Sequence, residues 1–108
     1  MIKTLGLIIL ATTLWGSHAS AQTVRATWYQ EGHHTANGER FNPDGMTVAH
    51  KTLKFGTKLR ITHKGKSVIV RVNDRGPFRK GYALDLSRGV ARKVGCTGTC
   101  TVDMVIVK

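Results

Sequence analysis

Beyond about residue 22 the chain consists of short segments in which apolar and polar residues alternate. A period of two is the pattern of a half-buried β-strand, because successive side chains of a strand point to opposite faces. The alternating segments lie at residues 24–28, 59–62, 68–72, 84–86 and 102–107. Lys64 and Gly65 separate the second segment from the third and predict a β-hairpin there. The pattern favours a mainly β domain, either a compact barrel or a sandwich.

One short helix is expected between the last two strands. Ser87 is a suitable N-cap, residues 88–94 are expected to be helical, and Gly95 is placed to end the helix. Residues 30–45 are polar and rich in turn-forming residues, which predicts a long loop. With 108 residues in all, the chain has room for one small domain and no second core.

The first residues have the pattern of a secretory signal peptide. Lys3 is followed by the apolar stretch 5–15, and residues 19–21 (Ala-Ser-Ala) have the small-x-small pattern of a cleavage site. We therefore expect a cleaved signal peptide at residues 1–21 and a domain at residues 22–108 that is periplasmic or secreted. The cleavage point has no cysteine, so a lipoprotein is not expected. No later apolar run is long enough for a membrane anchor.

The chain is strongly basic, with 17 Lys and Arg residues against 6 acidic ones and a formal charge of +11. Such a charge suits a polyanionic partner. Nucleic acid is not expected, because the domain is exported and contains no nucleic-acid motif. Anionic polymers of the cell wall are the alternative, and a general solubilising role for the charge is equally compatible with the sequence. The cations assigned to a wall-binding surface are Lys51, Lys54, Arg60, Lys64, Lys66 and Arg71.

The two cysteines, Cys96 and Cys100, are separated by Thr-Gly-Thr. In an exported protein disulfides persist, and a turn through Gly98 can bring both thiols together. A metal-binding pair is the other interpretation, but neither a second cysteine pair nor a nearby histidine completes a tetrahedral set. We predict a local disulfide between Cys96 and Cys100.

Five stretches carry ionisable or aromatic side chains where a chain of this kind turns or a strand ends. They are Ala-Thr-Trp-Tyr at 26–29, Thr-Ala-Asn-Gly-Glu at 35–39, Thr-Val-Ala-His-Lys-Thr-Leu at 47–53, Val-Asn-Asp-Arg-Gly-Pro-Phe at 72–78 and Ala-Leu-Asp-Leu-Ser at 83–87. In this order and spacing they resemble the rare lipoprotein A (RlpA) type of lytic transglycosylase, over about residues 25–107. The resemblance implies a six-stranded double-psi β-barrel with one or two short helices.

The same resemblance implies which residues form the site. Asp85 lies between two leucines, as a functional Asp does in related barrels, and Asp74 lies eleven residues earlier, as a second Asp does in expansin-like proteins. These two are the expected catalytic residues. The residues expected to bind substrate are Glu39, His50, Thr27, Tyr29 and Arg75. Strand alternation separates Trp28 from Tyr29, so one of them is expected in the core and the other at the sugar groove.

The chemistry of glycosidic cleavage assigns a role to each acid. The leaving oxygen needs a proton, and a cation-like sugar needs stabilisation. Asp85 suits the first task if its leucine neighbours exclude water, because desolvation raises the pKa of a carboxyl. Asp74 suits the second, because Arg71 and Arg75 are near in sequence and cations favour an ionised carboxylate.

Each of these residues also has a structural alternative. Asp85 could cap the helix that follows Ser87, and Asp74 could bind the backbone of its own turn. Glu39 could be a solvated loop acid, and a lone histidine such as His50 is often structural. The adjacent residues 33 and 34, both His, lack a third ligand, so no metal is expected, and the chemistry needs no organic cofactor.

The resemblance implies a lyase that cleaves the β-1,4 bonds between N-acetylmuramic acid and N-acetylglucosamine in peptidoglycan. The expected substrate is glycan strands that lack stem peptides, and the expected product is a 1,6-anhydro end. We expect the protein to act as a monomer. The alternative from another functional class is a non-catalytic, expansin-like protein that binds cell-wall glycans in the same groove.

Overall fold

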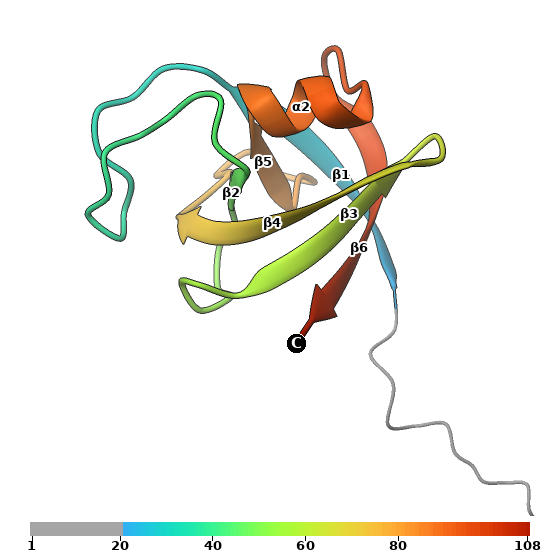
Figure 1. Cartoon of the computed structure of the whole chain (residues 1–108), viewed down its shortest axis with the longest axis horizontal. Coiled ribbons are helices and arrows are strands. Elements are labelled where there is room, and N and C mark those ends of the chain that lie inside the picture. Colours follow the sequence, from blue (N-terminus) through green and yellow to red (C-terminus); the bar gives the residue numbers. More distant parts are fainter. Residues whose placement is uncertain (1–20) are drawn as a thin grey trace, which may run out of the picture.

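The computed structural model describes residues 21–108, and most of the predicted signal peptide lies outside them. The described part contains six strands and one helix (Figure 1). Their bounds are β1 (Gln22–Tyr29), β2 (Thr47–Ala49), β3 (Lys58–His63), β4 (Lys66–Asp74), β5 (Leu84–Ser87), α2 (Arg88–Val94) and β6 (Cys100–Val107). No helix among residues 21–108 has the length and apolar character needed to cross a membrane.

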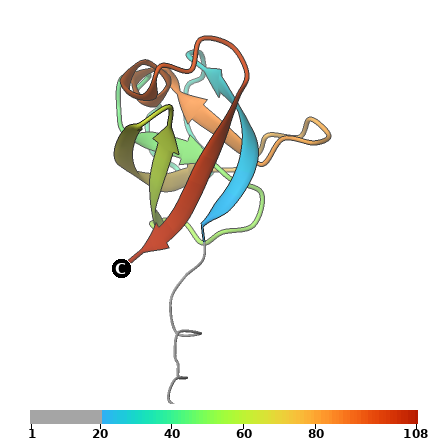
Figure 2. The ribbon, with the colours of Figure 1, turned by 90° about the vertical axis from the view of Figure 1, so that its right-hand side faces the viewer.

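The six strands close into a barrel in the order β1-β5-β2-β4-β3-β6. The pairs β1–β5 and β2–β4 are parallel, and the other four pairs are antiparallel. Figure 2 shows β1 and β6 side by side, although they lie at opposite ends of the described chain. This closed, mixed barrel confirms the predicted fold class. The strand at 47–49 was not predicted, since we placed this stretch among the turns. Its three residues are all buried, which leaves no alternation to detect.

The predicted hairpin is confirmed as β3 and β4. Lys64 and Gly65 connect them with φ values of 50° and 80°. Positive φ at both central positions matches a type I′ turn, whose twist suits two antiparallel strands. Residues 30–45 form the predicted loop, which extends to one side of the barrel in Figure 1.

Alternate residues of the strands fill the barrel. The fully buried members of this core include Leu59, Ile61, Val72, Leu84, Leu86 and Val102. Trp28 is partly buried and packs against them, so Trp28 is the member of the Trp28–Tyr29 pair that lies on the core side. β6 lies between β1 and β3, and Ile106 near the C-terminal end of this strand is 44% exposed.

Helix α2 covers one end of the barrel in Figure 1 and begins and ends where the sequence predicted. The Ser87 hydroxyl accepts a hydrogen bond from Val90 N and donates one to Gly45 O at 2.6 Å. Gly95 has a φ of 75° and donates its N–H to the last turn. Serine as N-cap and a left-handed glycine as C-cap satisfy backbone groups that the helix itself cannot pair.

Gly89 fixes the helix against the long loop, and its replacement tests that contact. Its N–H donates to Pro43 O at 2.8 Å, and a Cβ at this position would lie 2.6 Å from Asp44 O. We expect Gly89→Ala to lower the free energy of unfolding by about 2–3 kcal/mol, despite the better helix propensity of alanine, because overpacking moves backbone atoms. Urea unfolding measures the change. Gly98→Ala is the matched control, since no atom lies within 4 Å of its Cβ position. Equal stability of the two variants would contradict the close approach.

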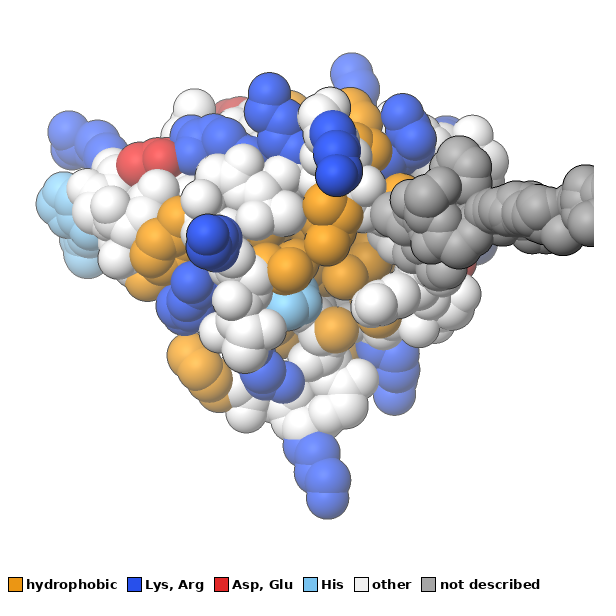
Figure 3. Space-filling view, turned by 90° about the horizontal axis from the view of Figure 1, so that it is seen from below, with side chains coloured by type: hydrophobic (Ala, Val, Ile, Leu, Met, Phe, Trp, Pro, Cys, Tyr) orange, Lys and Arg blue, Asp and Glu red, His pale blue; other side chains and the backbone are white. Residues whose placement is uncertain are grey.

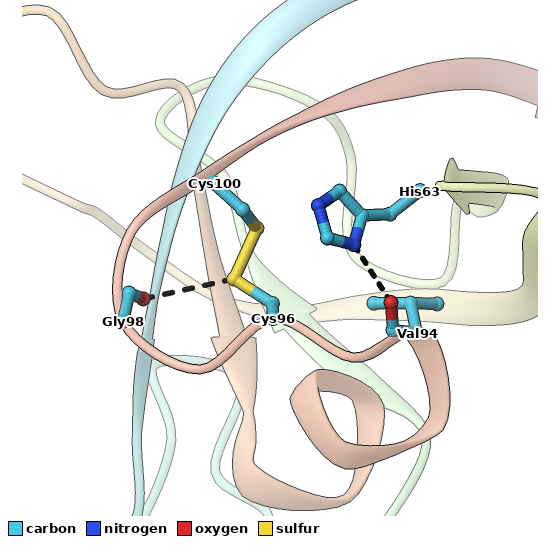
Figure 4. Close-up of a disulfide and its surroundings, with 5 residues drawn as sticks. All are labelled: His63, Val94, Cys96, Gly98 and Cys100. Carbon is cyan, nitrogen blue, oxygen red and sulfur yellow. Dashed lines mark hydrogen bonds between the residues drawn. A yellow bond between two sulfur atoms is a disulfide. The ribbon is translucent and has the colours of Figure 1, made fainter.

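The predicted disulfide is confirmed. Cys96 and Cys100 are bonded across the loop that joins α2 to β6 (Figure 4). Beside it, the buried His63 at the end of β3 forms a 2.7 Å hydrogen bond through Nδ1 with Val94 O at the end of α2. The disulfide and the histidine together join the end of the helix to the barrel wall.

Candidate active site

Asp85 lies on the outer face of the barrel wall. Its neighbours Leu84 and Leu86 are fully buried in the core, so alternation turns Asp85 to the other side of β5. In the register of the sheet Asp85 pairs with Thr27 of β1 on one side and with Ala49 of β2 on the other. The same Ala49 pairs with Asp74, the last residue of β4. The two predicted catalytic acids therefore lie on either side of β2, about 10 Å apart at their backbones.

Tyr29 contacts one of the two acids, Asp74. Its hydroxyl donates to Asp74 Oδ2 at 3.1 Å, and its ring stacks on Phe41 of the long loop with centroids 4.8 Å apart. Burial raises the pKa of Tyr29, and the negative charges of Asp74 and Asp85 raise it further. Tyr29 is thus the aromatic residue that faces the site, and it keeps its proton for donation to Asp74.

Asp85 is held in a condition that favours its protonated form. Partial burial raises the pKa of Asp85 to about 6, with a second contribution from the charge of Asp74. Its Oδ1 is buried and has no hydrogen-bond partner among the described residues. Because Ser87 is the N-cap of α2, the alternative that Asp85 caps this helix is wrong. A carboxyl of this kind can release a proton to a substrate near neutral pH.

Asp74 is positioned by two backbone N–H groups and a tyrosine hydroxyl, and by no arginine side chain. Its Oδ1 accepts from Ala36 N and from Arg75 N, both at 2.9 Å, and its Oδ2 accepts from Tyr29. Within residues 21–108 the side chains of Arg71 and Arg75 form no ion pair with Asp74, since Arg71 pairs with Glu39 and Arg75 donates to backbone carbonyls. The predicted turn contact is present in the bond from Arg75 N, but two of the three donors come from distant parts of the chain.

Arg75 supports the backbone that follows β2. Its Nη1 donates to His50 O at 3.0 Å and to Leu53 O at 2.8 Å, and the guanidinium lies 4.0 Å from the centre of the Phe55 ring. These contacts occupy the side chain that the sequence assigned to substrate binding. In this structure Arg75 orders the segment that carries His50.

His50 follows β2 directly and is held in one orientation. Its Nδ1 accepts from Thr52 N and Leu53 N, both at 3.1 Å, so the proton of the neutral ring is on Nε2. Burial lowers the pKa of His50, and the charges of Arg75 and Lys51 lower it further. The backbone N–H of His50 donates to Asp74 O at 3.2 Å. His50 therefore presents a fixed Nε2–H donor on a segment attached to Asp74.

Glu39 anchors the long loop to β4. Its two carboxylate oxygens accept from both terminal nitrogens of Arg71, one of these bonds at 2.7 Å, and also from Asn37 and Asn73. The bonds from Arg71, Asn37 and Asn73 lower the pKa of Glu39 to about 2. Glu39 is therefore an anchor that is charged at neutral pH, and its partner is Arg71, which the sequence assigned to a basic surface.

Removal of this anchor should loosen the loop. Glu39→Ala leaves Arg71, Asn37 and the buried Asn73 without their acceptor, so we expect the free energy of unfolding to fall by about 1–2 kcal/mol. Faster proteolysis within residues 30–45 should accompany the loss, and Glu39→Gln, which keeps one acceptor oxygen, should lose less. Urea unfolding and limited proteolysis measure both effects. An Ala variant as stable as the parent would show that the loop is held by other contacts.

Two hollows flank the acids along β2. The first, the Lys58 hollow, has a volume of about 310 Å³ and is lined by Glu39, Arg40, Asn42, Gly45, Met46, Thr47, Lys58, Ile69, Val70, Arg71 and Asn73. The second, the Tyr82 hollow, has a volume of about 520 Å³ and is lined by Thr23, Val24, Arg25, His50, Lys51, Thr52, Gly81, Tyr82 and Ala83. Since Thr47 borders the first hollow and His50 the second, Ala49 and the acids beside it lie between them. Figure 3 shows a hollowed apolar area with Lys and Arg side chains around it and few acidic ones.

The structure thus brings Asp85, Asp74, Thr27 and Tyr29 to one face and separates Glu39 from His50, which line different hollows. Residues 37 and 73, the asparagines that hold Glu39, were missed by the sequence analysis. The only sequence feature that could have identified these two asparagines is their position near Glu39 and Asp74 along the chain. Among residues 21–108, no three His, Cys, Asp or Glu side chains come together in a way that could hold a metal ion.

Comparison with known proteins identifies the family. The family model described as lytic transglycolase, a double-psi β-barrel domain, matches residues 21–106. The chain belongs to this family. Relatives by sequence carry the name endolytic peptidoglycan transglycosylase. The probable endolytic peptidoglycan transglycosylase RlpA of Synechocystis is 49% identical over 89 residues, which are 74% of this chain and 28% of that protein. Endolytic peptidoglycan transglycosylase RlpA of Pseudomonas aeruginosa is 51% identical over 86 residues, 73% of this chain and 25% of that protein.

The chain therefore spans about a quarter of the length of these relatives. Solved structures agree on the fold of the lytic transglycolase domain. The Streptomyces papain inhibitor matches with a TM-score of 0.70 at 18% identity, covering 85% of this chain and 98% of that one. The expansin of Clavibacter michiganensis matches with a TM-score of 0.67 at 25% identity, covering 82% of this chain and 51% of that one.

Proposed function

We propose that this protein is a lytic transglycosylase that cleaves the β-1,4 bonds between N-acetylmuramic acid and N-acetylglucosamine in peptidoglycan. The observation that carries the proposal is the half-buried Asp85, whose raised pKa keeps a proton available beside the hydrogen-bonded Asp74. The names of the relatives, endolytic peptidoglycan transglycosylases, support the substrate. Strands that lack stem peptides are the proposed substrate, and 1,6-anhydro ends are the proposed product.

In the proposed reaction Asp85 acts first as acid and then as base. Its proton goes to the oxygen that leaves with N-acetylglucosamine, and the glycosidic bond to C1 of the muramyl residue breaks. The C6 hydroxyl of the same muramyl residue then attacks C1, and its proton passes to the Asp85 carboxylate. Asp85 is thereby restored to its starting state, and no water is consumed. Asp74 stabilises the positive charge that develops on the sugar ring.

In this proposal the remaining site residues contact the substrate or hold the loops around it in place. Thr27 lies beside Asp85, and Tyr29 lies against Asp74, at the face where the sugar would bind. His50 would donate its Nε2–H to the substrate, while Glu39 and Arg75 hold the two loops on either side. We further propose that the active form is the monomeric domain of residues 22–108, exported after removal of residues 1–21.

Mass spectrometry of the products tests this function. Purified protein is incubated with stripped glycan strands, and 1,6-anhydromuramyl ends are expected with the parent protein and absent with Asp85→Asn. Reducing muramyl ends in place of anhydro ends would show hydrolysis. An unchanged yield in Asp85→Asn would exclude Asp85 as the acid.

A second candidate is a protein that binds wall glycans without cleaving them. The likeness to expansin favours it, since a mutant of the Clavibacter michiganensis expansin is known in complex with cellohexaose and matches this chain with a TM-score of 0.68 at 24% identity. Binding of stripped glycan by the parent protein with no new ends of either kind would support this candidate over the first.

A further inference from the structure

The Lys58 hollow combines an apolar floor with a cationic rim. Met46 and Ile69 supply the apolar surface, and Ile69 is 44% exposed. Arg40, Lys58 and Arg71 supply the cations, and Glu39 is the only acid among the lining residues. This composition differs from a general basic surface, because the charges surround a concave apolar area that a small ligand group can enter.

Two of the three cations are available to a ligand. The charge of Arg71 is neutralised by its ion pair with Glu39. Arg40 and Lys58 are exposed, and neither forms an ion pair within residues 21–108. The hollow therefore has two unneutralised positive charges, which attract an anionic group.

The hollow lies next to the acid pair on the same wall of the barrel. Lys58 pairs with Arg71 across β3 and β4, and Arg71 is three residues before Asp74, about 10 Å along the strand. Thr47 of the hollow and Ala49 between the two acids lie on the same face of β2, because they are two residues apart. A polymer that lies over the acids can therefore place a substituent in this hollow.

We propose that the Lys58 hollow binds the lactyl carboxylate of a muramyl residue next to the cleaved bond, with Arg40 and Lys58 pairing with the carboxylate and Met46 and Ile69 contacting the lactyl methyl group. The inference rests on the proposed function, which supplies the muramyl glycan. It adds a subsite and two specificity-determining residues, Arg40 and Lys58, neither of which the sequence analysis selected.

The chemistry of the lactyl group makes this subsite selective. In a strand that carries stem peptides the lactyl carbonyl is part of a neutral amide, and in a stripped strand it is a free carboxylate. Only the free carboxylate can pair with Arg40 and Lys58, and the amide also carries a peptide that the hollow would have to accommodate. A preference for stripped strands would then arise within this domain.

Binding to two chemically matched strands tests the proposal. Two ligands of the same length are compared: stripped glycan with free lactyl carboxylates, and the same glycan with these carboxylates converted to methylamides. Binding is measured by isothermal titration calorimetry with the Asp85→Asn protein, which prevents turnover. We expect the free-acid strand to bind roughly five- to tenfold more tightly than the amide, with a preference that decreases as salt is raised. Combining Arg40→Gln with Lys58→Gln should reduce the preference to about twofold or less. Lys93→Gln on α2, the matched control for charge, should retain it.

The outcomes separate this proposal from the proposed function. Equal affinity for the two strands, binding of neither strand, or a preference that survives the Arg40→Gln and Lys58→Gln pair would each overturn the subsite. The kcat/KM ratio of the unsubstituted protein on the two strands is a second measurement, and it should show the same preference, mainly through KM. If that protein cleaves neither strand while the binding preference holds, the proposed function fails and the carboxylate subsite stands.

Discussion

Asp85→Asn is expected to lower the rate of glycan cleavage by about 10²–10⁴-fold, the usual contribution of general acid–base catalysis. Asparagine matches aspartic acid in shape but has no proton to give to the leaving oxygen. Because burial and the charge of Asp74 raise the pKa of Asp85 to about 6, the parent protein should lose activity as pH rises through that value. A kcat profile against pH measures the descending limb.

Asp85→Asn lowers the rate of cleavage but should raise the free energy of unfolding above about pH 6. The pKa of Asp85 is higher in the folded protein than its ordinary value of 3.8. Asp85 therefore contributes to the stability of the folded state at low pH, and this contribution is lost as pH rises through about 6. Above that pH the parent protein carries a half-buried charge that Asp85→Asn lacks. We expect the variant to be more stable there by about 1 kcal/mol, after allowing for partial exposure. Thermal unfolding at several pH values measures this difference.

Asp103→Asn provides the matched control for both measurements. Asp103 is exposed on β6 and accepts a hydrogen bond from Thr23, far in the register from the acid pair. Its replacement should leave the rate and the pH profile unchanged. If Asp85→Asn retains the activity, Asp85 is not the acid. If Asp85→Asn is less stable than the parent protein above pH 6, where Asp85 is ionised in the parent, the assigned environment of this carboxyl is wrong.

Asp74→Asn should produce the second large loss, about 10²–10³-fold in kcat, if its charge stabilises the cation-like sugar. It should also move the descending limb of the pH profile to lower pH, because the charge of Asp74 is one of the two causes that raise the pKa of Asp85. A residue with a purely structural role would not move this limb. The measurement is kcat as a function of pH for the parent and the variant.

Tyr29→Phe separates the charge of Asp74 from its hydrogen bond. This variant removes the 3.1 Å bond from the Tyr29 hydroxyl but leaves the Asp74 carboxylate and its two backbone donors in place. We expect a loss of about tenfold or less and a limb shifted much less than in Asp74→Asn. If Tyr29→Phe and Asp74→Asn behave alike in both respects, Asp74 acts only as a support for Tyr29.

Local patterns were sufficient for those features that neighbouring residues determine. The β3–β4 hairpin follows from alternation around Lys64 and Gly65, whose positive φ values suit a two-residue turn. Helix α2 follows from a serine cap and a terminal glycine. The disulfide follows from two cysteines close enough in sequence to meet across one turn. The two acids were selected through resemblance to a family, and the barrel places them on either side of β2.

The partners of the charged groups were determined only by the tertiary structure. The sequence predicts arginines beside Asp74, because residues 71 and 75 are near it along the chain. The long loop instead returns to β4 and brings Glu39 to Arg71 and Ala36 to Asp74. Likewise, Arg40 and Lys58 line one hollow although they come from a loop and a strand that are distant in sequence. The alternation of apolar and polar residues indicates which face of a strand a side chain occupies. Which residues of other strands and loops that side chain contacts is determined by the closure of the barrel.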